Sequence, residues 1–143
     1  MASDGAQLSE LGLAIKRAQW RHHRELDRRL IAIGGSLAQW DAVRQIAQNP
    51  GASMHHLAEL TFQSDQSFGS QATRLITRGL VERVQGPGRT QHHVLTTAGQ
   101  TFRAAGQKVA DEVLADSFAA LDRTQLTQLQ ELLGRLNGES SQK

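Results

Sequence analysis

Apolar residues recur every three or four positions along most of the chain, which indicates a mainly helical protein. Gly34-Gly35 ends the first run, because glycine tolerates the left-handed backbone that often follows a helix. Ser36 can cap the second helix, and Asn49-Pro50-Gly51 stops it. Ser53, Ser64 and Thr97 are the expected caps of later helices. The predicted helices span about residues 7–33, 37–48, 54–61, 65–78, 97–119 and 123–136.

The spacing of apolar residues changes after Leu80, where the helical period gives way to alternation. Residues 81–84 alternate as a strand, Gly86-Pro87-Gly88 is turn-forming, and residues 91–95 return as a second strand. The segment therefore predicts a β-hairpin whose tip carries Arg89.

The order of these elements is informative about fold and function. Two short helices joined by a tight turn and followed by a two-stranded wing form a common device for reading duplex DNA. We predict a mainly α fold with a small β-hairpin wing, that is, a winged helix-turn-helix in a single domain over residues 1–143. Residues 36–98 would form the DNA-reading core, and residues 7–33 and 97–136 would flank it as long helices.

The helix predicted after Ser64 has the composition of a recognition helix. Phe68 and Ala72 fall on an inward face, while polar residues share an outward arc and Gly69 would let the backbone approach the duplex. Glutamine can pair with adenine, serine with base edges or phosphates, and arginine with a phosphate. A polar face turned to solvent is the alternative. The predicted DNA-binding residues of this helix are Ser64, Gln66, Ser67, Ser70, Thr73 and Arg74.

The hairpin tip adds Arg89 and Thr90 to the predicted DNA-binding residues. A cation on a glycine-flanked loop can enter a narrow minor groove, although an exposed arginine can also simply solubilise a turn. Nearer the wing base, Arg78 and Arg83 are expected to orient the wing or to contact phosphates. The arginines of the helix-wing segment outnumber its two acids, Asp65 and Glu82, which favours DNA over a protein partner.

Composition excludes several other classes of protein. The chain has no cysteine, so disulfides, thiolate nucleophiles and cysteine zinc sites are absent. No apolar run approaches the ~20 residues of a membrane span, and a cytoplasmic protein is expected. No phosphate loop or nucleophile-base motif is visible, so we expect neither an enzyme nor a cofactor. The three His-His pairs point their side chains apart, and no metal site is predicted.

Several motifs together resemble the MarR family of transcriptional regulators. They are Leu57-Ala58-Glu59, the capped helix 64–78, the string Arg78-Gly79-Leu80-Val81-Glu82-Arg83 and Leu95-Thr96-Thr97-Ala98-Gly99. The resemblance covers about residues 8–136. It implies a homodimer in which residues 7–33 and 97–136 are the dimerisation helices. The dimer would bind a pseudo-palindromic operator in double-stranded DNA, and a small aromatic ligand would release it. Two family features are missing, since Gly86-Pro87-Gly88 replaces the acid that holds the tip arginine and Ser70 replaces an arginine.

Trp20, Trp40 and Asp41 are the predicted ligand-binding residues, because they would lie near the pocket that the resemblance implies. Tryptophan suits stacking on an aromatic ligand, although both residues could instead fill the dimer core. Asp41 could equally pair with Arg44 three residues later. The resemblance thus implies a homodimeric repressor released by a small aromatic ligand. The alternatives are a regulator without such a ligand and a winged-helix protein-protein interaction module.

Overall fold

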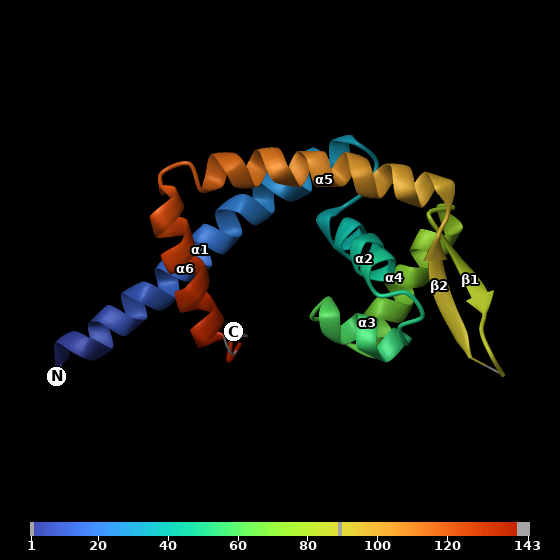
Figure 1. The fold of residues 1–143 in the computed structure, drawn as a ribbon, viewed down its shortest axis with the longest axis horizontal. Coiled ribbons are helices and arrows are strands. Elements are labelled where there is room, and N and C mark those ends of the chain that lie inside the picture. Colours follow the sequence, from blue (N-terminus) through green and yellow to red (C-terminus); the bar gives the residue numbers. More distant parts are fainter. Residues whose placement is uncertain (1, 89, 140–143) are drawn as a thin grey trace.

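The computed structural model describes residues 2–88 and 90–139. Six helices and one antiparallel hairpin follow the predicted order, as expected for a mainly α winged helix-turn-helix fold (Figure 1). The elements are α1 (Ala2–Ala32), α2 (Leu37–Gln48), α3 (Met54–Leu60), α4 (Asp65–Thr77), β1 (Val81–Gln85), β2 (Gln91–Leu95), α5 (Thr97–Ser117) and α6 (Arg123–Leu136).

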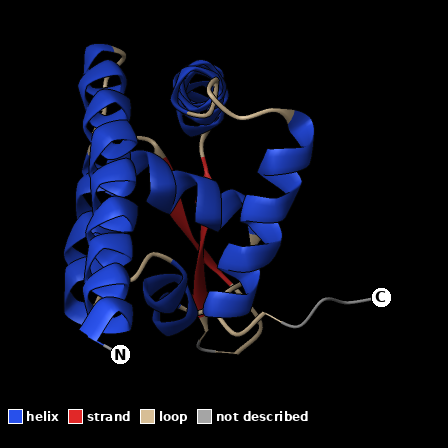
Figure 2. Cartoon of the chain, turned by 90° about the vertical axis from the view of Figure 1, so that its left-hand side faces the viewer, coloured by secondary structure: helices blue, strands red, loops and turns tan. Residues whose placement is uncertain are grey.

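The molecule has a helical frame and a compact head. The C-terminal half of α1 packs against α5, and α2, α3, α4 and the hairpin form the head beneath them (Figure 1). Viewed nearly along α5, α1 and α6 stand on opposite sides of the molecule (Figure 2). The 21-residue helix α5 therefore runs from the end of the wing to the loop before α6.

One hydrophobic core joins the head to the frame. Its fully buried side chains come from α1 (Leu30), α2 (Val43), α3 (Leu57) and α4 (Phe68 and Leu75), and α5 adds further apolar residues. These residues recur at helical spacing, so each helix buries one stripe and leaves its polar side outward. Burial of this stripe is what fixes the head against α1 and α5.

The ends of the chain leave large apolar side chains exposed. The first half of α1 and the length of α6 carry most of them, and none of the residues of α6 is buried. Large apolar side chains left exposed together mark interaction sites in folded proteins. The exposed set on these two helices is Leu8, Leu11, Leu13, Ile15, Trp20, Ile31, Leu126, Leu132 and Leu136.

The cap of α5 differs from the prediction by one residue. Thr96, and not Thr97, caps the helix, because its hydroxyl accepts a hydrogen bond from Gly99 N over 3.0 Å and donates one to Gly79 O over 2.6 Å. The backbone of Gly99 lies so close to Leu80 that a Cβ there would come within 2.0 Å of Leu80 O. The start of α5 is thereby fixed to the base of the wing.

No helix in residues 2–88 and 90–139 is both long and apolar enough to cross a membrane.

Candidate nucleic-acid interface

The outward face of α4 depends on a well-anchored inward face. Phe68, Ala72 and Leu75 are fully buried, and Ser64 caps the helix by accepting a hydrogen bond from Ser67 N over 3.1 Å. The carboxylate of Asp65 follows the cap, at the end where the helix dipole favours negative charge. The helix is therefore held by its apolar stripe and its N-terminus, and its other side is left free.

Two glutamines fix the turn that precedes α4. Gln63 Nε2 donates to Oε1 of the buried Gln71 over 2.9 Å, and Gln63 Oε1 accepts from Ser67 Oγ over 3.0 Å. The side chain of Gln63 thus ties the turn to the first two turns of α4. Sequence reasoning missed this role, although a glutamine at the inward position 71 of an amphipathic helix is a signal for a buried polar bond.

All six predicted DNA-binding residues of α4 are exposed on its outward side, but they differ in how free their polar groups are. Ser64 and Ser67 are bonded within the cap and the turn, and Thr73 Oγ1 donates to Gly69 O over 3.1 Å. Three side chains make no hydrogen bond to any residue within 2–88 or 90–139. These are Gln66, Ser70 and Arg74.

Gly69 has a packing role that the sequence did not suggest. A Cβ at this position would lie 3.3 Å from Cε of Met54, so the glycine lets the start of α3 pack closely against α4. The half-buried position of Gly69 against Met54 shows a role in helix packing, and close approach of its backbone to the duplex stays a prediction.

The wing is a regular two-stranded hairpin. Val81 pairs with Leu95 and Gln85 pairs with Gln91, and Gly86 N donates to Thr90 O over 2.8 Å to close the tip. Thr90 is exposed, and its hydroxyl donates to Pro87 O over 2.7 Å. The predicted tip residue Arg89 lies outside the described residues.

Arg78 does not take the role expected for it. Its guanidinium donates to Gln39 Oε1 over 2.6 Å and to Gly34 O, so it joins the end of α4 to the loop between α1 and α2. The side chain is directed toward the frame and not toward the wing, while a phosphate contact of Arg78 stays a prediction. Arg83 on β1 is exposed.

An acidic and imidazole cluster lies beside the start of α4. His55 Nδ1 is 2.9 Å from Asp65 Oδ1, and its Nε2 is 2.9 Å from Glu59 Oε1. The hydrogen bond to Asp65 and the charges of both carboxylates raise the pKa of His55 above its ordinary value. Protonation of His55 therefore adds positive charge next to the reading face.

The predicted ligand-binding residues are only partly brought together. Trp40 and Asp41 line a hollow of about 230 Å³ between α1, α2 and α5, whereas Trp20 does not line it and is 57% exposed on α1. Trp40 is buried and donates from Nε1 to Arg103 O over 3.1 Å. Asp41 pairs with Arg44 at 3.0 Å, and the Arg44 guanidinium lies 4.8 Å from the Trp40 ring centroid. Burial raises the pKa of Asp41, an effect that Arg44 opposes.

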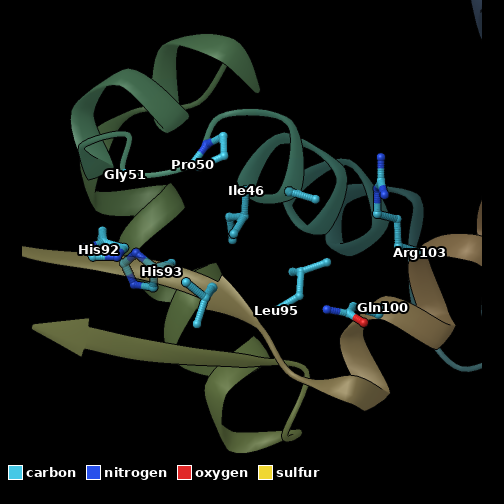
Figure 3. Close-up of a pocket in the computed structure, with 10 residues that line it drawn as sticks. Ile46, Pro50, Gly51, His92, His93, Leu95, Gln100 and Arg103 are labelled. Carbon is cyan, nitrogen blue, oxygen red and sulfur yellow. The ribbon is translucent and has the colours of Figure 1, made fainter. Parts of the chain in front are cut away.

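A second hollow, of about 470 Å³, lies behind the wing between β2, the end of α2 and the start of α5 (Figure 3). His93 of β2 is buried in its wall, and neither ring nitrogen has a hydrogen-bond partner among the described residues. Burial, with smaller effects of Arg83 and His92, lowers the pKa of His93. The buried imidazole of His93 thus packs within the wall of this hollow.

No group of three or more histidine and acidic side chains in the described part of the chain is arranged to hold a metal ion.

Comparisons with known proteins agree with this architecture. The sequence profile described as the MarR family matches residues 33–95, which run from the end of α1 to the end of the wing. A search of curated proteins finds no match. Among solved structures, the chain is similar to a probable transcriptional regulator from Pseudomonas aeruginosa, with 28% identity and a TM-score of 0.75 over 87% of this chain and 95% of that one.

Two further solved structures contain bound molecules. A mutant MarR from E. coli, complexed with operator DNA, has 19% identity and a TM-score of 0.81 over 91% of this chain and 95% of that one. A MarR family protein from Mycobacterium tuberculosis, complexed with p-aminosalicylic acid, has 24% identity and a TM-score of 0.74 over 89% of this chain and 98% of that one. At these identities the likeness to the last two concerns the fold alone.

Proposed function

We propose that the chain is a member of the MarR family of winged helix-turn-helix proteins and a sequence-specific, DNA-binding transcriptional regulator that acts as a homodimer; the family profile over residues 33–95 and the shared fold support this. The observation that carries the proposal is the outward arc of α4, where Gln66, Ser70 and Arg74 are exposed and have unused polar groups. Their side chains can bind base edges and phosphates without breaking a bond inside the protein.

Each side chain of the arc has a distinct role in this proposal. Gln66, in the first turn of α4, offers an amide that can bond adenine through two hydrogen bonds. Ser70 lies one turn further and can bond a base edge or a phosphate, while Arg74 neutralises a phosphate. Arg89 and Thr90 of the hairpin tip are proposed to contact the flanking minor groove.

The dimer is proposed from the unpartnered apolar surface of α1 and α6. A second copy of the chain would cover the exposed leucines of both helices and set two α4 helices about one duplex turn, ~34 Å, apart. In this arrangement residues 7–33 and 97–136 are the dimerisation helices and 36–98 is the reading core. The matching DNA site is a pseudo-palindrome.

The decisive experiment compares sequence preference with and without the arc. A duplex is selected from a random library with the wild-type protein and then titrated against Gln66→Ala/Ser70→Ala and Arg74→Ala proteins. We expect the double variant to lose preference for the selected duplex over random duplexes, because both side chains proposed to bond base edges are removed. Thr127→Ala, an exposed position on α6, is the matched control. Unchanged affinity and preference in both variants would rule out α4 as the reading helix.

We further propose that the regulator is a repressor and that a small aromatic acid lowers its affinity for DNA. Support comes from the hollow beside Trp40, whose wall holds the Arg44 guanidinium and apolar residues of α1 and α5. The p-aminosalicylic acid complex of the Mycobacterium tuberculosis protein indicates the ligand class. A ligand wedged between frame and head favours a different separation of the two α4 helices and thus weakens DNA binding.

The ligand proposal is tested by tryptophan fluorescence. The Trp20→Phe protein retains Trp40 as its single tryptophan, so quenching during titration with salicylate reports this hollow alone. Asp41→Asn and Arg44→Gln test whether the ion pair contributes to binding. Absence of quenching with a series of aromatic acids would favour the alternative, a regulator that has no small-molecule ligand.

A further inference from the structure

Phe62 is the most exposed large apolar residue of the described chain. It lies in the turn between α3 and α4, and 98% of its surface is accessible to solvent. An isolated apolar residue on a surface is common, but a whole phenyl ring without protein contacts gains nothing from folding. The ring is therefore available to a partner.

The backbone of Phe62 is unusual as well, with a φ of 57° in the left-handed region. Two hydrogen bonds require this conformation, one from Phe62 N to Glu59 O (3.1 Å) and one from Gln63 N to Ala58 O (2.8 Å). Together they end α3 in the pattern that usually has glycine at this position. Phenylalanine is strained here, and strain of this kind is concentrated at functional sites.

The turn presents Phe62 beside the reading face of α4. The next residue, Gln63, is turned inward and bonded to Gln71, and Ser64 caps α4 one residue later. Phe62 is thus two residues from the N-terminus of the helix that holds Gln66 and Ser70. Its neighbours in sequence, Thr61 and Gln63, are polar, so the ring stands alone among polar residues of the turn.

We infer that Phe62 is a DNA contact whose ring packs on apolar atoms of the duplex, namely deoxyribose carbons and thymine methyl groups, at the edge of the groove that α4 enters. The inference rests on the proposed function and adds an apolar contact to the polar arc. Apolar side chains recognise the thymine methyl group in major grooves, and Phe62 is the largest exposed apolar side chain near the polar arc.

The test exploits the strain, because affinity and stability should change in opposite directions. We compare Phe62→Gly with the wild-type protein in two measurements. One is the Kd for the duplex that the wild-type protein selects, and the other is the Tm of each protein. We expect Kd to rise about tenfold as the apolar contact is lost. The Tm should rise by a few degrees because glycine relieves the left-handed backbone. The salt dependence of Kd should stay unchanged, since no charge is removed.

Phe62→Leu is the matched control, because it keeps an apolar side chain and the same backbone strain. Its Kd should lie between those of wild type and Phe62→Gly, without the gain in Tm. Replacing each thymine of the duplex by deoxyuridine in turn distinguishes thymine methyl groups from deoxyribose carbons. If one replacement weakens binding of the wild-type protein but not of Phe62→Gly, the ring contacts that methyl group. If no replacement has this effect, the ring contacts deoxyribose.

Two results would overturn the inference. One is an unchanged Kd for Phe62→Gly, and the other is a loss of affinity together with a lower Tm, which would assign Phe62 a structural role in the turn. If the wild-type protein selects no duplex at all, the proposed function fails first, and that outcome is distinguishable from failure of the Phe62 contact.

Discussion

The indole of Trp40 lies directly against the backbone of Gly106, where an added Cβ would be only 2.2 Å from both Cδ1 and Nε1. The contact joins α2 of the head to the middle of α5. Because the indole Nε1 also donates to Arg103 O, the ring cannot slide aside without losing a hydrogen bond. A small residue at position 106 is thus required for the head to sit on the frame.

Gly106→Ala should therefore destabilise the protein even though alanine favours helices. We expect the free energy of unfolding to fall by about 1–3 kcal/mol, the usual cost of overpacking a core. Urea unfolding measures it. Gly5→Ala on α1 is the control, because nothing lies within 4 Å of its added Cβ, and it should be neutral or slightly stabilising. Equal stability of Gly106→Ala and wild type would contradict the tight Trp40 contact.

Arg74→Ala should weaken DNA binding for all sequences alike. The lost phosphate contact should reduce the slope of log Kd against log salt by about one unit. Titrations of the selected duplex at several salt concentrations give this slope. Arg123→Ala, at the start of α6, removes an exposed arginine far along the chain from α4 and should leave the slope unchanged. The same slope for wild type and Arg74→Ala would exclude a phosphate contact.

Leu132→Asp should separate the proposed dimer. Leu132 is 55% exposed on α6, and a carboxylate buried there against a second copy would have no partner. Sedimentation equilibrium should give a monomer for this variant and a dimer for wild type. Thr127→Asp places the same charge on another side of α6 and should remain dimeric. A wild-type monomer at all concentrations would refute the arrangement.

His93→Leu should reduce the acid sensitivity of the fold. Burial holds the pKa of His93 below its ordinary value of 6.5, so the unfolded chain binds a proton at a higher pH than the folded one. The contribution of the buried imidazole to the free energy of unfolding is therefore complete above the ordinary pKa, and it is lost as the pH falls below that value. At neutral pH the leucine should be neutral or stabilising, because it removes an unpartnered buried imidazole.

Urea unfolding of His93→Leu and wild type at neutral and mildly acidic pH tests this expectation. His92→Leu keeps the buried imidazole and should retain the sensitivity of wild type. If His93→Leu loses as much stability as wild type on acidification, the effect comes from other groups.

His55 should titrate above its ordinary pKa of 6.5, because Asp65 and Glu59 stabilise its protonated form. The stabilisation of the folded protein by this cluster is present below the ordinary pKa of histidine, and it is lost as the pH rises through the raised pKa. Proton NMR of the His55 ring measures the shift. Asp65→Asn should lower the pKa toward the ordinary value, and Glu131→Gln, on α6, should not change it. An unshifted His55 in the wild-type protein would contradict the cluster.

The order of helices and strands could be predicted from the sequence, because helix stops, apolar spacing and strand alternation agree with the tertiary contacts. Asn49-Pro50-Gly51 stops α2 whatever packs on it, and the alternation after Leu80 leaves no helical alternative. The inward positions of α4 followed from spacing as well, since Phe68 and Ala72 recur at helical period and are buried. Cap residues were predictable to within one position, as Thr96 illustrates.

The contacts that hold the site together could not be predicted, because they join segments distant in the sequence. The bond from Arg78 to Gly34 depends on how α4 meets the frame, and the separation of Trp20 from the hollow beside Trp40 depends on where α1 leaves the head. The left-handed conformation of Phe62 also lacked a signal, since that position would ordinarily hold glycine. The eight predicted DNA-binding residues remain predictions, and Arg89 lies outside the described residues.

The close contact of Gly99 with Leu80 has a mechanical consequence for the proposed dimer. It anchors one end of α5 at the wing, and the other end leads into α6. The helix is about 31 Å long, so a tilt of only about 5° displaces its two ends by about 3 Å relative to each other. Small rearrangements between two copies would thus be amplified into movements large enough to take both wings out of register with their grooves.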